Sequence, residues 1–435
     1  MICGMSFTRR SFLTSAGAAT AALSVRLTAQ APPQISPPSG APAVVTANEA
    51  YWQQVASHYR VADKVINLEA GYWGVMATPV AEEYVRQVER VNRESSYYAR
   101  RSYPADLTVV RDRLAAFLRV QPDEIAFTRS ATESLHCLIG GYNRLKSGDA
   151  VLFADVDYPA MQNAMKWLAE RRGVRVVRFG LPEPATYENV IAAYEETLKQ
   201  NPDVRLVLLT HVSNKTGLVV PVAELSRLAR SRGADVIVDA AHSIGQMDIG
   251  VPDIGADFVG FNLHKWIGAP LGVAVVYIKK TRLGDVDRMM GDDESPAASI
   301  NSRVHTGTTN FAAFLTVPAA LDFHVKVGTA HTAARLRYLR DRWVSAVRNV
   351  PAIQVLTPDD PRMSAGITSF RFTGRGTRQD VERVVDTLLT KYGIFTARRT
   401  GIDGGDCVRV TPALYTRPAD VDRLAAALKE MATAG

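Results

Sequence analysis

Short apolar runs alternate with amphipathic stretches through the middle of this 435-residue chain. Runs rich in β-branched residues, typical of buried strands, occur at 124–128, 150–154, 174–179, 204–210, 235–238, 258–261 and 273–278. Apolar residues recur at helical spacing between them, at 107–118, 160–172, 187–200 and 222–232. Repeated strand–helix units predict a mainly parallel sheet with helices on both faces. We therefore expect an α/β fold.

The pattern changes towards the C-terminus. Residues 311–349 have helical spacing without a strand signal. Strands are then predicted at 366–372 and 407–411, and helices at 378–391 and 418–431. This predicts a large domain with an N-terminal arm, residues 48–310, followed by a linker helix and a smaller α+β C-terminal domain, residues 311–435.

The N-terminus carries a separate signal. Arg9 and Arg10 precede a short, Ala-rich apolar run, and residues 1–31 together resemble a twin-arginine export signal. Cleavage after Ala31 fits the small-residue rule, but Pro32 follows, so cleavage after Ala43 is the alternative. We expect a periplasmic protein, exported by the twin-arginine translocase, with residues 32–47 as a Pro/Ala-rich linker.

Composition limits the classes of function. Hydrophobic residues make up 47% and charged residues 22% of the chain, enough for a large core and two domains. The formal charge of +7 falls to +4 without residues 1–31, which contain three arginines and no acid. No cluster of basic residues is present, so nucleic acid is not indicated. Cys137 and Cys407 follow the signal, and we expect two buried thiols; a disulfide is the alternative.

Two predicted strands end in groups of opposite charge. Asp239 ends one apolar run, and Lys265 follows another beside the bulky Trp266. The carboxyl ends of parallel strands meet at one edge of a sheet, where α/β sites form. Desolvation would lower the pKa of Lys265 and free its amine for a Schiff base, while Asp239 could keep a pyridine nitrogen protonated. The alternatives are a solvated lysine and a helix-capping carboxylate.

A phosphate cradle is predicted at Ser130-Ala131-Thr132, where a strand turns into a helix and backbone N–H groups face outwards. An ordinary helix cap is the alternative. The glycine-rich dinucleotide motif does not follow the first strand, which disfavours a nicotinamide cofactor. His242, three residues after Asp239, could hydrogen-bond a cofactor's phenolic oxygen or act as a supporting residue.

From about Asn67 to Leu428 the sequence resembles the class V aminotransferase family of pyridoxal-phosphate enzymes, of fold type I, which includes cysteine desulfurases and isopenicillin N epimerases. The motifs that carry the resemblance are 128–133, 211–217, 239–242, 264–265, 307–310 and 408–409. The resemblance implies a large domain with a mainly parallel seven-stranded sheet flanked by helices, a smaller C-terminal domain, and pyridoxal 5'-phosphate as cofactor. It implies no metal.

The resemblance also implies a role for each matching residue. Lys265 would form the Schiff base and shuttle the α-proton, and Asp239 would hold the pyridinium. The other catalytic and cofactor-binding candidates are His242, Tyr158, Asn214, Ala131, Thr132, Asn262, His264 and Thr308. Of these, Thr308 would reach the cofactor of the other subunit in a homodimer. The candidates for binding an amino-acid-type substrate are Arg409, for the α-carboxylate, with Asn214, Tyr72, Trp73 and Arg399.

The departures from the family pattern bear on the reaction. One desulfurase branch has a reactive cysteine in the loop after an Arg-Thr-Gly, but no cysteine lies in residues 402–406 here. Cys407 could face the same way as Arg409 on a strand, although a structural thiol is expected. Arg100 or Arg101 facing the site would indicate a second carboxylate on the substrate; a solvated or interface pair is the alternative.

We therefore expect a periplasmic pyridoxal-phosphate enzyme acting on an amino acid or an amino-acid-derived metabolite, as an aminotransferase or in the manner of isopenicillin N epimerase. The alternatives are a cysteine desulfurase or C–S lyase, and an enzyme that modifies a siderophore side chain. A catalytically silent periplasmic binding protein is the alternative outside enzymes, and it would have no need of Lys265.

Overall fold

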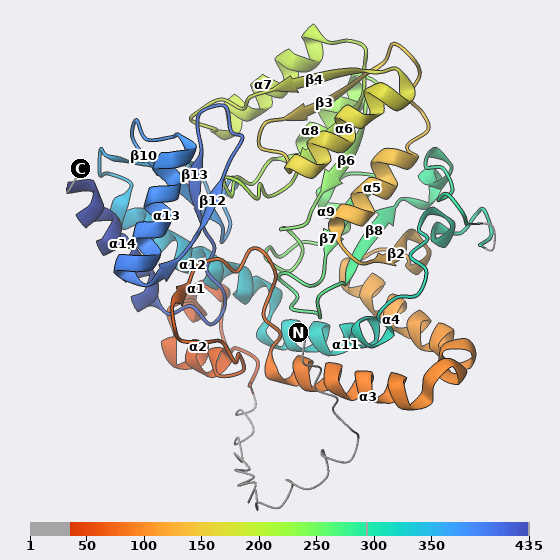
Figure 1. Ribbon diagram of the computed structural model, residues 1–435, viewed down its shortest axis with the longest axis horizontal. Coiled ribbons are helices and arrows are strands. Elements are labelled where there is room, and N and C mark those ends of the chain that lie inside the picture. The colour runs from red at the N-terminus through yellow and green to blue at the C-terminus, as the bar shows by residue number, and fades with distance from the viewer. Residues whose placement is uncertain (1–34, 293–294, 434–435) are drawn as a thin grey trace, which may run out of the picture. The chain divides into compact units, whose positions relative to one another are not determined.

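A seven-stranded sheet forms the centre of the computed structural model, which describes residues 35–292 and 295–433 (Figure 1). Its strand order is β2-β8-β7-β6-β5-β3-β4, and only β8 runs antiparallel to its neighbours. The strands are β2 (Ile125–Thr128), β3 (Ala150–Ala154), β4 (Arg175–Phe179), β5 (Val204–Thr210), β6 (Asp235–Asp239), β7 (Phe258–Asn262) and β8 (Ala274–Ile278). The predicted mainly parallel seven-stranded sheet is confirmed.

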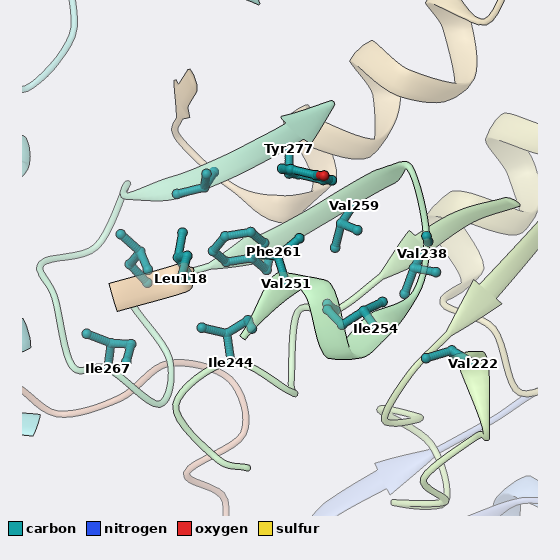
Figure 2. Packing of buried hydrophobic residues seen from close by; sticks show 14 of the residues in the cluster. Leu118, Val222, Val238, Ile244, Val251, Ile254, Val259, Phe261, Ile267 and Tyr277 are labelled. Atoms are coloured by element: carbon teal, nitrogen blue, oxygen red, sulfur yellow. The ribbon is translucent and has the colours of Figure 1, made fainter. Parts of the chain in front are cut away.

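Helices cover both faces of this sheet, because successive strand side chains point to opposite sides. In β7, Val259 and Phe261 belong to one core cluster and Phe258 to another. The first cluster includes α4 (Tyr103–Leu118), α7 (Tyr187–Gln200), α8 (Val222–Ser231) and α9 (Val251–Ile254). The second includes α5 (Ala131–Gly141) and α6 (Pro159–Arg172). Figure 2 shows Val238, Val259 and Phe261 packed beside Leu118 and Ile254 in the first cluster.

A second, antiparallel sheet of four strands lies in the C-terminal part, with the order β12-β13-β10-β9. Its strands are β9 (Ile353–Val355), β10 (Thr368–Phe372), β12 (Ala397–Arg399) and β13 (Cys407–Val410). This sheet and the helices α12 (Thr329–Val347), α13 (Arg378–Tyr392) and α14 (Pro418–Thr433) share a third core cluster, the C-terminal core cluster. Helices α10 (Phe311–Leu315) and α11 (Val317–Val327) precede them, so the single linker helix expected over this region is three helices.

The segment 35–47 differs from the predicted linker. It contains the short helix α1 (Pro42–Val45), and the side chains of Ile35 and Val45 are buried in the first core cluster. The indole N–H of Trp52, on α2 (Glu49–Ala56), donates to the Val45 carbonyl at 2.8 Å. Two apolar side chains are enough to anchor a stretch that its Pro/Ala composition made look unstructured. The proposed signal, including Arg9, Arg10 and Cys3, lies outside the described residues.

The N-terminal arm packs on the C-terminal part of the chain. Strand β1 (Ile66–Asn67) pairs in parallel with β11 (Ile394–Phe395), and Leu68 is buried in the C-terminal core cluster. Glu69 forms an isolated bridge with Thr411. The arm therefore carries residues 69–74 from the C-terminal sheet to the end of β7, since the Gly74 N–H donates to the His264 carbonyl at 2.8 Å.

Helix α3 (Thr78–Arg101) is broken at Ser95, which has a φ of 52°. No single helix within 35–292 or 295–433 has the length and apolarity to cross a membrane. The helices Phe311–Val327 and Thr329–Val347 reach this length and apolarity only when the two are taken together, and the chain bends by 69° between them. Most of the apolar side chains of this pair belong to the core clusters.

Candidate active site

A cavity of about 510 Å³ opens where strands β5, β6 and β7 end, which is the edge of the sheet that the sequence predicted. Thr210, Asp239 and Asn262, the last residues of these three strands, all line it. The candidate residues that it brings together are Lys265, Asp239, His242, Tyr158, Ala131, Thr132, Asn214, Asn262, His264, Arg409, Arg399, Tyr72 and Trp73.

Thr308 is not among them. It lies on an exposed stretch between Arg303 and α10, away from the cavity of its own chain. Its predicted contact with the cofactor of a second subunit stays a prediction. Arg100 and Arg101, at the exposed end of α3, do not line the cavity either.

Lys265 lies beside the imidazole of His242. Its Nζ atom lies 3.1 Å from Nε2 of His242, and the indole N–H of Trp266 donates to Nδ1 of the same imidazole at 3.4 Å. Burial lowers the pKa of Lys265 to about 8, partly opposed by the Asp239 carboxylate. Burial also lowers the pKa of His242 far below its ordinary value, and the Lys265 ammonium acts in the same direction. A nucleophilic amine beside a neutral imidazole is therefore available near neutral pH.

Asp239 is only 3% exposed at the end of β6. Its Oδ1 atom accepts the N–H of Ala241 at 2.9 Å, which fixes the orientation of the carboxylate. Burial raises the pKa of Asp239, and the Lys265 ammonium partly opposes this. The small side chains of Ala240 and Ala241 follow, so a flat ring can approach the carboxylate without a steric clash.

The start of α5 forms the predicted anion cradle, with one correction. The Ala131 N–H is not free, because it donates to Oδ1 of Asn262 at 2.8 Å. The Glu133 N–H likewise donates to the Ser130 hydroxyl at 3.1 Å. Because the Oδ1 atom of Asn262 is used in this way, its amide NH₂ group remains as a hydrogen-bond donor for an anion. Thr132 supplies a hydroxyl at the first helical turn.

His264 adds a ring nitrogen to the same region. Its Nδ1 atom lies 3.0 Å from the Val273 carbonyl, which can only accept, so Nδ1 carries the proton. Burial lowers the pKa of His264 to about 4, and Nε2 is left without a proton. A phosphate dianion beside the ring would raise this pKa and convert Nε2 into a donor.

Asn214 carries an unsatisfied group. Its Oδ1 atom is buried without a hydrogen-bond partner within the described residues, although its side chain lines the cavity. A buried amide oxygen without a donor is costly, so it is expected to meet a bound molecule. The full set of groups fits pyridoxal phosphate: an amine for the aldehyde, a carboxylate for the pyridine nitrogen and a helix start for the phosphate.

Two arginines from the C-terminal sheet reach the cavity. Arg409, on β13, is 1% exposed, and burial lowers its pKa to about 10. Its Nη1 donates to the Asn214 carbonyl at 3.0 Å, and Nε of Arg399 donates to the same carbonyl at 3.1 Å. Both guanidinium groups also bind the carboxylate of Glu69, Arg399 at 3.1 Å.

Glu69 was missed in the sequence. It stands in a glycine-punctuated loop, and no local pattern shows that a strand more than three hundred residues later brings an arginine to it. Gly71 and Gly74 flank the exposed rings of Tyr72 and Trp73. A Cβ on Gly74 would lie 1.8 Å from the Lys265 carbonyl, so this loop fits over the lysine only because position 74 has no side chain.

Neither described cysteine lines the cavity. Cys407 is fully buried, and its thiol donates to the Lys215 carbonyl at 3.5 Å. The Cys137 thiol donates to the Arg303 carbonyl at 2.6 Å. Burial raises the pKa of each thiol to about 12. Both sulfurs are therefore protonated thiols at neutral pH, and the two are not joined in a disulfide.

The loop 400–406, where one desulfurase branch has its cysteine, is fixed to the large domain. Lys215 donates to the Gly401 carbonyl at 3.0 Å, and the Asp403 N–H donates to Asp155 at 2.9 Å. Arg178 pairs with the Asp403 carboxylate. These contacts hold the loop against the end of β3, against β4 and against the segment that follows β5, so its side chains have little freedom to enter the cavity.

Comparison with known proteins gives a consistent family. The sequence model of the family described as aminotransferase class-V matches residues 76–424. The chain is 27% identical over 394 residues to the isopenicillin N epimerase of Streptomyces clavuligerus, covering 87% of this chain and 97% of that protein. It is 28% identical over 352 residues to a protein of Methanothermobacter thermautotrophicus named probable cysteine desulfurase, covering 76% and 84%.

The fold agrees with this assignment. The apo structure of the cysteine desulfurase from Thermococcus onnurineus NA1 superposes with a TM-score of 0.74 at 20% identity, covering 88% of this chain and 98% of that one. The family match covers most of the chain, including the cradle, the buried carboxylate, the lysine and both arginines. The protein is thus an enzyme with pyridoxal 5'-phosphate as its cofactor, and it belongs to the aminotransferase class-V family.

Proposed function

We propose that the enzyme moves the α-proton of an amino acid, or of a metabolite derived from one, as an epimerase or an aminotransferase does. One observation carries this proposal: within the described residues, the cavity joins an amine base to carboxylate-binding arginines and contains no thiol. Proton transfer at an α-carbon needs that base and that anchor, whereas persulfide formation needs a nucleophilic sulfur.

Each residue has a defined task in this proposal. When bound, pyridoxal phosphate supplies an aldehyde that joins amines and a protonated ring that accepts the electron pair left at the α-carbon. Lys265, with its pKa lowered to about 8, would hold the aldehyde and would act as the base that takes the α-proton of the substrate. Asp239 holds the proton on the pyridine nitrogen, and Arg409 orients the substrate carboxylate.

The names of the relatives point to two different reactions. The Streptomyces clavuligerus protein is an isopenicillin N epimerase, and the Methanothermobacter thermautotrophicus protein is named a cysteine desulfurase. Neither Cys137 nor Cys407 lines the cavity, which favours the first kind of chemistry. Release of a β-substituent needs no protein thiol, so a C–S lyase is the competing reaction, and modification of a siderophore side chain uses the same groups.

Reaction with D- and L-amino acids in D₂O separates these outcomes. Epimerisation gives deuterium at the α-carbon with both enantiomers present, and transamination gives a keto acid with the aminated cofactor. Sulfide and pyruvate from cysteine would instead identify a lyase. Persulfide on Cys137 or Cys407 after reaction with cysteine would contradict the proposal.

The assignment of Lys265 has its own test. The purified enzyme should show the visible absorption band of lysine-bound pyridoxal phosphate, and Lys265→Ala should lose it. The matched control is Lys199→Ala, at the exposed end of α7, which should keep the band. A band that survives in the Lys265→Ala protein would reject this lysine as the attachment point.

We also propose export to the periplasm through the twin-arginine route. The support is the pair Arg9-Arg10 before a short apolar run, together with a cofactor that would be inserted before a folded protein crosses the membrane. Replacing both arginines by lysine should leave the full-length protein in the cytoplasm, as measured by cell fractionation. Unchanged export of the double variant would reject this route.

A further inference from the structure

Glu69 lies between the two arginines of the cavity and contacts both. Its Oε1 atom accepts Nη2 of Arg399 at 3.1 Å and Nη2 of Arg409 at a shorter distance. Its Oε2 atom accepts Nε of Arg409 at 3.3 Å. Glu69 thus covers the Nε–Nη2 edge of Arg409, the edge that a planar carboxylate would bind in the same two-point geometry.

Most donors of Arg409 are therefore used within the protein. A guanidinium group carries five N–H donors, and Glu69 takes two of those of Arg409. The Asn214 carbonyl takes a third at 3.0 Å. The loop closes the same side, since a Cβ on Gly71 would lie 2.7 Å from Nη2 of Arg409. Only the two remaining N–H groups, on Nη1 and Nη2, can meet a ligand.

The net charge of the two arginines and Glu69 also restricts how much negative charge a ligand can bring to this site. Arg399, Arg409 and Glu69 carry one uncompensated positive charge between them, and the side chains of all three are less than one-quarter exposed. The side chains at the open rim are uncharged, namely Tyr72, Trp73, Tyr158 and Leu271. Arg100 and Arg101, the other candidates for a second carboxylate, lie outside this cavity.

We propose that Glu69 is a specificity-determining residue that limits the arginine site to a single carboxylate. The substrate is then an amino acid with one carboxylate at this end and an uncharged, apolar or aromatic side chain at the rim. The amino-acid part of this inference rests on the proposed function, whereas the limit of one carboxylate rests on the cluster alone.

The limit can be measured with propionate and succinate, which lack an amino group and differ by one carboxylate. Isothermal titration of the cofactor-loaded enzyme should give dissociation constants for the two within about threefold of each other. Glu69→Gln, which removes the charge and keeps the shape, should favour succinate over propionate by tenfold or more. An unchanged ratio in Glu69→Gln would overturn the proposal.

Two further variants keep the test decisive. Glu69→Asp retains the charge and should keep the ratio of the unaltered enzyme; a tenfold shift there would show that charge does not set the limit. If Glu69→Gln does not fold, Arg399→Gln serves in its place, because it cancels the net positive charge. Both ligands should then bind at least tenfold more weakly, and unchanged binding would reject the proposal.

Glu49→Gln is the matched control. Glu49 also stands in the N-terminal part and pairs with a fully buried arginine, Arg335, but it does not line the cavity. Its replacement should leave the propionate-to-succinate ratio unchanged. The titration needs no turnover, so its result is separate from the visible band that tests Lys265. Deuterium exchange at the α-carbon without the ratio change rejects only the role of Glu69, whereas the ratio change without deuterium exchange rejects only the proposed function.

Discussion

The Nε2 atom of His242 lies 3.1 Å from the amine of Lys265, while its Nδ1 atom faces the indole N–H of Trp266. An indole nitrogen can only donate, so Nδ1 of the neutral imidazole accepts and Nε2 carries the proton. Lys265 must then accept this hydrogen bond, which an ammonium cannot do. Trp266 therefore favours the neutral amine of Lys265 through the tautomer that it selects in His242.

The first prediction concerns the pH at which Lys265 reacts. Because burial lowers its pKa to about 8, the rate at which cofactor-free enzyme captures pyridoxal phosphate should rise with pH, with its midpoint at about pH 8. Trp266→Phe should move this midpoint upwards by about one pH unit, since His242 can then offer an acceptor that stabilises the ammonium. Stopped-flow absorbance across a pH series measures the midpoint.

The control for this experiment is Trp167→Phe. Trp167 is 43% exposed on α6 and does not line the cavity that holds Lys265. Its replacement should leave the midpoint in place. A Trp266→Phe midpoint equal to that of the unaltered enzyme would show that the indole does not control the tautomer.

The architecture and much of the site could be read from the sequence because both depend on local patterns. β-Branched runs mark the strands, and residues that directly follow them, such as Asp239 and Lys265, must gather at one edge of a parallel sheet. Glu69 could not be found in this way. Its partner Arg409 is 340 positions away, and the pairing depends on strand β1 adding to β11.

The roles of two lysines also show what local sequence patterns cannot predict. Lys215 and Lys265 both stand in family motifs. Lys215 is buried and Lys265 is half-buried, and burial lowers the pKa of each. The sequence assigned the Schiff base to Lys265, but the task of Lys215 became visible only in the structure. Lys215 donates to the carbonyls of Asp155 and Gly401, which holds the loop 400–406, whereas Lys265 lines the cavity. Burial depends on tertiary packing, and composition around the residue does not specify it.

The second prediction concerns the loop over Lys265. Gly74→Ala should lower the free energy of unfolding by about 3 kcal/mol or more, because the new Cβ would lie 1.8 Å from a backbone oxygen that cannot move independently. Gly284→Ala is the control, since a Cβ there meets nothing within 4 Å, and it should change stability by less than about 0.5 kcal/mol. Urea unfolding measures both; equal stabilities would contradict the close approach of the loop to the lysine.

The third prediction concerns the thiols. Because burial raises the pKa of Cys137 and of Cys407 to about 12, the thiolate fraction at pH 8 is about one in ten thousand. Both should resist alkylation in the folded enzyme and react fully in urea, as measured by mass spectrometry. Cys407→Ala should also retain turnover. Rapid labelling of Cys407 in the folded enzyme, or loss of turnover in the variant, would contradict this prediction and support persulfide formation at Cys407.

The fourth prediction uses the two acids at opposite ends of strand β6. Asp239→Asn keeps the oxygen that accepts the Ala241 N–H, so the variant should fold and hold the cofactor on Lys265. Its amide cannot keep a proton on the pyridine nitrogen, because it replaces a negative acceptor by a neutral group that donates. The rate of α-deuterium exchange in D₂O should therefore fall about a hundredfold or more, with the visible band retained.

Asp235→Asn provides the comparison within the same strand. Asp235 pairs with Arg282 at 2.6 Å and lies away from the cavity, so its replacement should lower stability and leave the exchange rate within about threefold. The ratio of the two exchange rates then separates electron withdrawal by the ring from a general effect of removing an acid from β6. Similar rates in the two variants would mean that the Asp239 charge does not act on the cofactor.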